Sequence, residues 1–140
     1  MVEEQKFWKT NTGYTLRWIG ILPIGVACYF LAHFLVKLVG SFSARSEEGD
    51  FNLLHLFLPG IAVGIAAYAF VYIGTAISPS HKKIVGMILL IFVILFSGMV
   101  LFVLIARGFE WDYFLEGLGQ IIGGVIAFFQ IDQEEKEKYE

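Results

Sequence analysis

Four long runs of apolar residues, separated by short polar connectors, dominate the pattern of hydrophobic and polar positions. The runs cover residues 18–40, 52–77, 84–106 and 113–131. A helix of about 20 apolar residues, rising 1.5 Å per residue, is long enough to cross a hydrocarbon core of roughly 30 Å. The pattern therefore predicts an all-α polytopic membrane protein, a bundle of four transmembrane helices.

The polar segments flank one predicted transmembrane domain, residues 18–131. In residues 1–17 aromatic side chains alternate with cations, which is typical of the membrane interface, and we expect a cytoplasmic or interfacial segment there. Residues 132–140 predict a charged cytoplasmic tail, either disordered or a frayed extension of the fourth helix. The run 113–131 is the weakest of the four, and a re-entrant or surface helix is its alternative.

The connectors carry residues that commonly begin or end helices. We expect Gly40 to end the first helix and Gly108 to end the third, because glycine is favoured just beyond a helix. Ser80 is expected to cap the start of the third helix. The third run has no charge and few small residues, so we expect it to be the helix that faces lipid most.

Composition agrees with a membrane protein. Hydrophobic residues make up 57% of the chain and charged residues 16%, against about half and about a quarter in soluble proteins. The charges gather in the connectors and at the two ends, as expected of a chain that has the lipid bilayer as its partner. There is no dense basic block, so nucleic-acid binding is not supported.

The distribution of Lys and Arg predicts the orientation. Cytoplasmic flanks of membrane helices are enriched in these residues. With four spans both termini lie on one side, and that side receives seven of the ten: Lys6, Lys9, Arg17, Lys82, Lys83, Lys136 and Lys138. We therefore expect both termini in the cytoplasm, with the protein in a bacterial inner (plasma) membrane.

Small residues recur in stripes at helical spacing along the second and the fourth runs. They allow close approach of helix backbones, which drives association where lipid removes the hydrophobic contribution. The second run carries two such stripes, so we expect it at the centre of the bundle. The candidate packing residues are Gly60, Gly64, Ala67, Gly74, Gly119, Gly123, Gly124 and Ala127.

Five polar residues within the apolar runs form the candidate functional cluster. They are His33, Lys37, His55, Glu116 and Gln120. The predicted topology places the four ionisable ones, all but Gln120, at similar depth in the outer half of the membrane. Ionisable groups in a membrane are costly and often functional, so the cluster could bind an ion or relay protons. The structural alternative is that Lys37 and Glu116 extend to the interface and His33 bonds across helices.

Cofactor chemistry has one weak candidate. His33 and His55 are expected on adjacent antiparallel helices, where they could ligate a haem from both sides. No ligand spacing points to a metal site. Cys28 is the only cysteine and is expected to be a packing residue. We find no catalytic motif.

These observations favour a non-enzymatic membrane protein that acts by helix association. Its partner would be another copy of the chain or another membrane protein, to which it would be an accessory subunit. The surplus of small-residue faces suggests this hypothesis. The alternatives are an oligomeric ion or proton channel or transporter that uses the polar cluster, and a redox subunit with a haem.

Overall fold

Four long helices make up the part of the chain that the structure describes. The computed structural model describes residues 11–44 and 53–137, and within them the side chains of 11–41 and 56–137. The helices are α2 (Asn11–Ala44), α3 (Leu53–Ile77), α4 (Lys82–Arg107) and α5 (Trp111–Glu137). Each contains a segment long and apolar enough to cross a membrane. The described ranges contain no strand, and the predicted all-α fold is confirmed.

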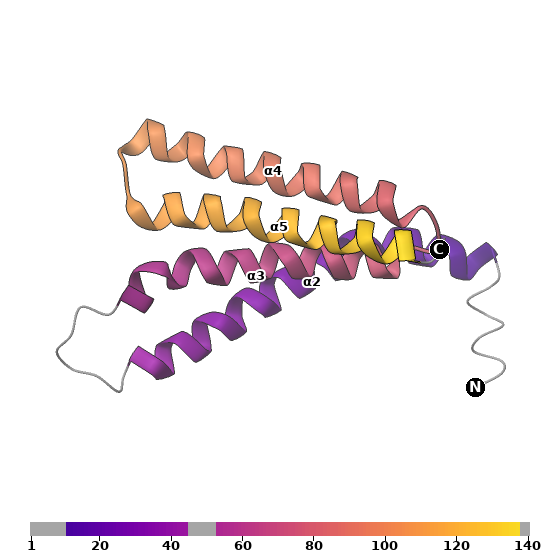
Figure 1. The fold of residues 1–140 in the computed structure, drawn as a ribbon, viewed down its shortest axis with the longest axis horizontal. Helices are drawn as coiled ribbons and strands as arrows, with labels where there is room; N and C mark the ends of the chain where they lie inside the picture. Colours follow the sequence, from indigo (N-terminus) through magenta and orange to yellow (C-terminus); the bar gives the residue numbers. More distant parts are fainter. Residues whose placement is uncertain (1–10, 45–52, 138–140) are drawn as a thin grey trace.

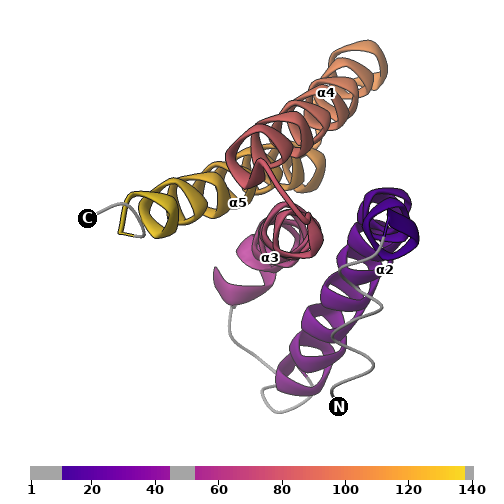
Figure 2. The same cartoon turned by 90° about the vertical axis from the view of Figure 1, so that its right-hand side faces the viewer.

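The helices reverse direction at each connector, so α3 and α5 run in the same direction. The start of α2, the turn between α3 and α4 and the end of α5 all lie at one end of the molecule (Figure 1). Viewed along the helices, α3 lies between α2 and α5, and α4 covers α5 (Figure 2). The closest packing is between α3 and α5, and α3 also contacts α2 and α4.

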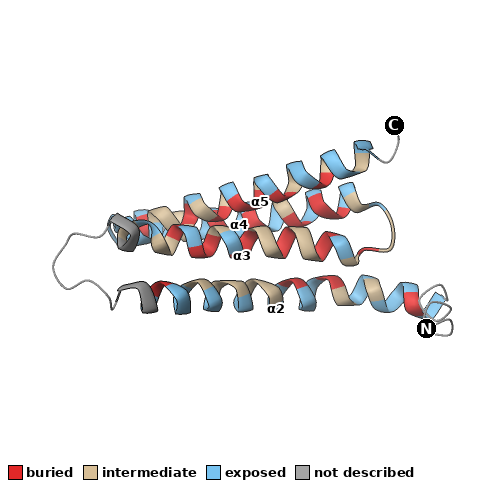
Figure 3. Ribbon diagram, turned by 60° about the horizontal axis from the view of Figure 1, so that its bottom comes forward, coloured by how far each residue is buried: buried red, intermediate tan, exposed pale blue. Residues whose placement is uncertain are grey.

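The core lies where α3, α4 and α5 meet. Its fully buried members are small or β-branched, among them Ala67, Val71 and Ala127, and larger apolar residues such as Leu89 and Val93 surround them. Figure 3 shows buried positions along the inner faces of these three helices and few of them on α2. Helix α2 therefore lies beside a three-helix group.

The third helix, expected to face lipid most, is not the least buried of the described helices. In α2, 11% of the residues in the apolar segment are buried, against 22% in α4. The reason is packing: α4 lies against both α5 and α3, whereas α2 contacts α3 extensively and no other helix to a comparable extent. The presence of large side chains along a helix does not predict how many other helices pack against it.

Two of the three predicted helix ends differ from the structure. Helix α2 continues through Gly40 to Ala44, and Gly40 instead leaves room for the side chain of Leu58 on α3. His81, in the left-handed region at φ 52°, precedes α4 without a side-chain cap, so Ser80 does not cap it. Gly108 is confirmed: its φ is 110° and its N–H donates to the carbonyl oxygen of Leu104 at 3.1 Å.

The charged segment after the fourth apolar run continues α5 as helix to Glu137. Asp132, whose side chain is 16% exposed, accepts ion pairs from Lys83 of α4 and from Lys136, the latter at 2.7 Å. The backbone N–H of Lys83 also donates to Glu135 at 3.3 Å. These contacts attach the last turns of α5 to the start of α4.

Candidate functional site

A glycine contact between α3 and α5 sets the spacing of the helices around the site. Gly60 and Gly64 lie one turn apart on α3, opposite Gly119 and Gly123 on α5. A Cβ added at Gly119 would overlap the carbonyl of Gly60, and one added at Gly123 would overlap that of Gly64. Only glycine permits this approach, which resembles the small-residue contacts of associating membrane helices.

The other predicted small residues also lie inside the chain. Ala67 and Ala127 are fully buried in the core. A Cβ at Gly74 would lie 2.7 Å from Leu89 of α4, and one at Gly124 would lie 3.0 Å from Val93. All eight candidate packing residues are thus used between helices of the same chain.

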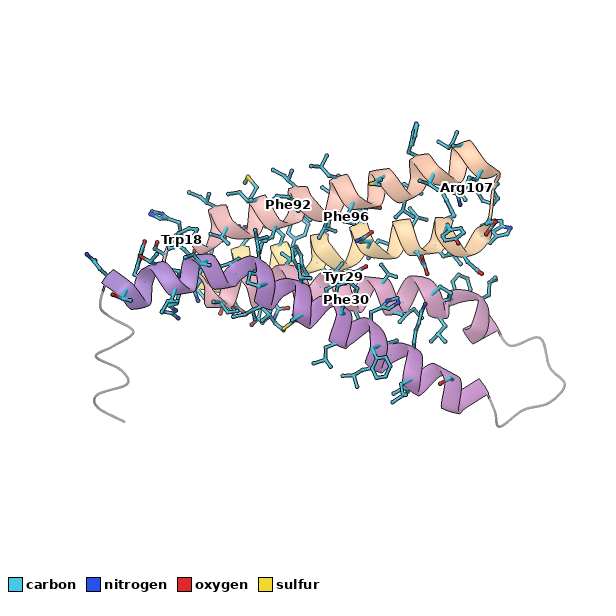
Figure 4. The ribbon with its side chains drawn as sticks, turned by 180° about the vertical axis from the view of Figure 1, so that it is seen from behind. Trp18, Tyr29, Phe30, Phe92, Phe96 and Arg107 are labelled. Carbon is cyan, nitrogen blue, oxygen red and sulfur yellow. The ribbon has the colours of Figure 1, made fainter. Side chains whose placement is uncertain are left out.

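A cavity of about 370 Å³ lies on the side of α3 where α2 and α4 stand apart. Its walls are apolar except for Tyr29 and Gln120. In Figure 4, Tyr29 and Phe30 of α2 lie at the same level as Phe92 and Phe96 of α4. The lining residues are Leu22, Val26, Tyr29, Phe30, Phe70, Phe92, Val93, Phe96 and Gln120.

The cavity has a buried floor and an exposed mouth. Phe70, Val93 and Gln120 are buried, with Gln120 only 6% exposed. At the mouth, Phe30 and Phe96 are 66% and 64% exposed. Access from outside is therefore between α2 and α4.

Two polar side chains of the cavity, Gln120 and Tyr29, have no hydrogen-bond partner among the described residues. Within the described ranges, no side chain or backbone group is hydrogen-bonded to the amide of Gln120 or to the hydroxyl of Tyr29. Gln120 is buried as a residue and lines the cavity, and polar side chains in such positions almost always have a partner. The cavity thus offers donors and acceptors to whatever occupies it.

His33 adjoins this cavity through Tyr29. Their rings stack at a centroid distance of 6.3 Å and an angle of 3°. The Nδ1 atom of His33 is buried and has no hydrogen-bond partner among the described residues. The charges of Lys37 and Glu116 both act on His33 electrostatically.

The predicted polar cluster is thus represented in the structure only in part. Glu116 is half-buried on α5, Lys37 is exposed on α2, and Gln120 faces the apolar cavity. His55 belongs to α3, but its side chain lies outside the described residues, as does any haem geometry that depends on it. An ion or proton pathway and a haem site stay predictions.

A second polar group of residues joins α3 to α5 at the end where α5 finishes. The hydroxyl of Tyr68 donates to Gln130, and that of Tyr72 donates to Glu134 at 2.9 Å. These two tyrosine rings stack at 5.6 Å. Since the contacts are exposed and connect neighbouring helices, they serve to fix α5 against α3.

Two residues that the sequence analysis did not single out contribute to the cavity and to helix packing. Tyr29 was not a candidate, because a tyrosine in an apolar run gives no signal of its own. Ser97, one of the few small residues of the third run, donates a buried hydrogen bond of 2.6 Å to the carbonyl of Gly117 on α5. In the described part of the chain, no three of His, Cys, Asp and Glu are grouped as metal ligands.

The fold and site define a class, an all-α protein with four helices long and apolar enough to cross a membrane. Comparison with protein-family models, curated proteins and solved structures finds no match to this chain.

Proposed function

We propose that the chain is a polytopic protein of a bacterial inner membrane, with both termini in the cytoplasm, that acts by helix association. It would work without an enzymatic activity, either as a homo-oligomer or as an accessory subunit of a larger membrane complex. Four helices of sufficient length support the membrane location. The excess of Lys and Arg at the end where α2 begins and α5 finishes supports the orientation.

The observation that carries the association is the position of α2. This helix spans Asn11–Ala44 and, among the described helices, packs extensively on α3 alone. By contrast, the small-residue stripes that first suggested association are occupied by contacts within the chain. The proposed surface for a partner therefore lies on α2 and not on α3 or α5.

The flank of α2 opposite the cavity carries an ordered apolar stripe. Its members recur at intervals of four and three residues, the spacing of helices that pack side by side. They are Ile24, Cys28, Leu31, Leu35 and Leu38. All but the half-buried Cys28 are exposed, and we name this set the α2 stripe.

Cys28 belongs to the α2 stripe, so disulfide crosslinking can test the proposal without the introduction of a new cysteine. If two copies associate through the α2 stripe in parallel, mild oxidation of membranes joins two Cys28 side chains in a disulfide-linked dimer. Moving the cysteine to Leu31, in a Cys28→Ala background, retains the crosslink. Moving it to Val26, on the cavity side, abolishes it.

If the chain is instead an accessory subunit, crosslinking from the α2 stripe gives a different product. A photoreactive group at position 31 then yields one defined heterologous adduct, and the same group at position 26 does not. A chain that stays monomeric in mild detergent, forms no disulfide dimer and gives no position-specific adduct contradicts both forms of the proposal.

A further inference from the structure

The two unpaired polar groups in the cavity lie close to the middle of their helices. Tyr29 is halfway along the apolar run 18–40, and Gln120 is within about one turn of the centre of the run 113–131. Val93 and Phe96 are likewise near the middle of α4. In the proposed membrane, the cavity therefore lies at the level of the bilayer centre, far from lipid headgroups.

This depth restricts the occupant. A phospholipid chain lying in the cavity brings no hydrogen-bonding atom to the bilayer centre, since its polar groups stay at the interface. It would leave the amide of Gln120 unpaired, at a free-energy cost that buried polar groups normally avoid. Among the residues that the structure describes, no charged one lines the cavity, so a charged ligand has no counter-ion from them there.

Size and shape restrict the occupant further. A transmembrane helix is about 10–12 Å across with its side chains and cannot enter a space of about 370 Å³. That volume lies in the range of small-molecule pockets, roughly 300–1,000 Å³. The aromatic walls, Phe30, Phe70, Phe92 and Phe96, offer faces and edges to a ring.

We propose that the cavity between α2 and α4 binds an uncharged, ring-bearing membrane lipid of the prenylated quinone class. A ring carbonyl accepts hydrogen bonds from the amide N–H of Gln120 and the hydroxyl of Tyr29. The apolar tail leaves between Phe30 and Phe96 into the membrane. An oxidised quinone ring carries acceptors only, which complements these two donors.

This inference rests on the proposed location in a membrane and not on the proposed association. The α2 stripe and the cavity occupy opposite flanks of α2, so a ligand and a partner helix do not compete for one surface. A quinone site can fail while the membrane location stands.

Ligand-dependent thermal stability of the purified full chain in detergent tests the proposal. The probe is a benzoquinone with a decyl tail, and the matched control ligand is decylbenzene, which has the ring and tail but no carbonyl. We expect a saturable rise in melting temperature with the quinone and none with decylbenzene.

Three substitutions in the cavity and one control outside it separate the site from non-specific partitioning into the micelle. Gln120→Leu and Tyr29→Phe each remove a donor and keep the volume, and each should weaken the apparent affinity for the quinone about five- to tenfold. Val26→Trp narrows the mouth and should abolish saturation. Gln133→Leu, an exposed change on α5 away from the cavity, should leave the affinity unchanged.

A second readout does not depend on how a variant folds. A photoreactive quinone with the same tail should label α2 and α4 of the unmodified chain, and excess decyl quinone should compete with it. Equal stabilisation by decylbenzene, or labelling spread evenly over the four helices, would overturn the quinone site. Recovery of the chain in the soluble fraction without detergent would instead overturn the membrane location.

Discussion

At the residue scale, two polar residues within the apolar runs, Ser97 and Gln120, differ in whether their polar atoms have a hydrogen-bond partner. Ser97 has its partner across the helix interface, at the Gly117 carbonyl, so its hydroxyl is satisfied within the chain. Gln120 is also buried, though less completely, and has no partner among the described residues. A polar group that is buried and unpaired lowers stability and is retained where a ligand or partner uses it.

Replacing Gln120 with leucine should therefore stabilise the empty protein. The substitution keeps the approximate volume and removes an unpaired amide, so we expect a gain of about 1 kcal/mol in the free energy of unfolding. Thermal unfolding in detergent without added ligand measures it. A loss of stability in this variant would mean that the amide has a partner, and would remove the argument for a polar ligand.

At the element scale, the contact of α3 with α5 determines the architecture. The two helices run in the same direction and meet at two pairs of glycines, a geometry in which each backbone lies against the other. Helix α4 closes this pair through Val93 and Leu89, and the ion pairs of Asp132 attach the end of α5 to α4. Helix α2 is added on the far side of α3.

Gly119→Ala should destabilise this pair of helices strongly. The new methyl group would overlap the carbonyl of Gly60, and overpacking of this kind costs about 1–3 kcal/mol. Gly98→Ala is the matched control, because a Cβ there has nothing within 4 Å and alanine favours the helix. Thermal unfolding of both variants compares them, and equal stability of the two would contradict the close contact.

The sequence predicted the elements well and their neighbours less well. Four apolar runs led to four helices, and the φ of 110° at Gly108 is one that glycine adopts without strain. The prediction that Gly40 ends the first helix was wrong because glycine both ends helices and permits close packing. Only the position of Leu58 on α3 shows that Gly40 serves packing. The cavity could not be foreseen at all, since it depends on α2 standing apart from α4.

At the scale of the whole molecule, all four described helices expose large apolar side chains. The exposed large apolar residues include Ile19 and Phe34 on α2, Leu95 and Ile105 on α4 and Phe129 on α5. Water would disfavour an apolar surface of this extent, whereas lipid accommodates it. Membrane insertion is therefore the claim on which the orientation, the association and the quinone site all depend.

Sidedness of single cysteines tests that claim most directly. In a Cys28→Ala background, Asn11→Cys, Glu110→Cys and Glu137→Cys place exposed thiols at the start of α2, between α4 and α5, and at the end of α5. A membrane-impermeant thiol reagent added to intact cells should label Glu110→Cys alone, and inside-out vesicles should reverse the result. Labelling of Asn11→Cys and Glu137→Cys from opposite sides, or of all three in a soluble fraction, would contradict a four-span membrane protein with both ends in the cytoplasm.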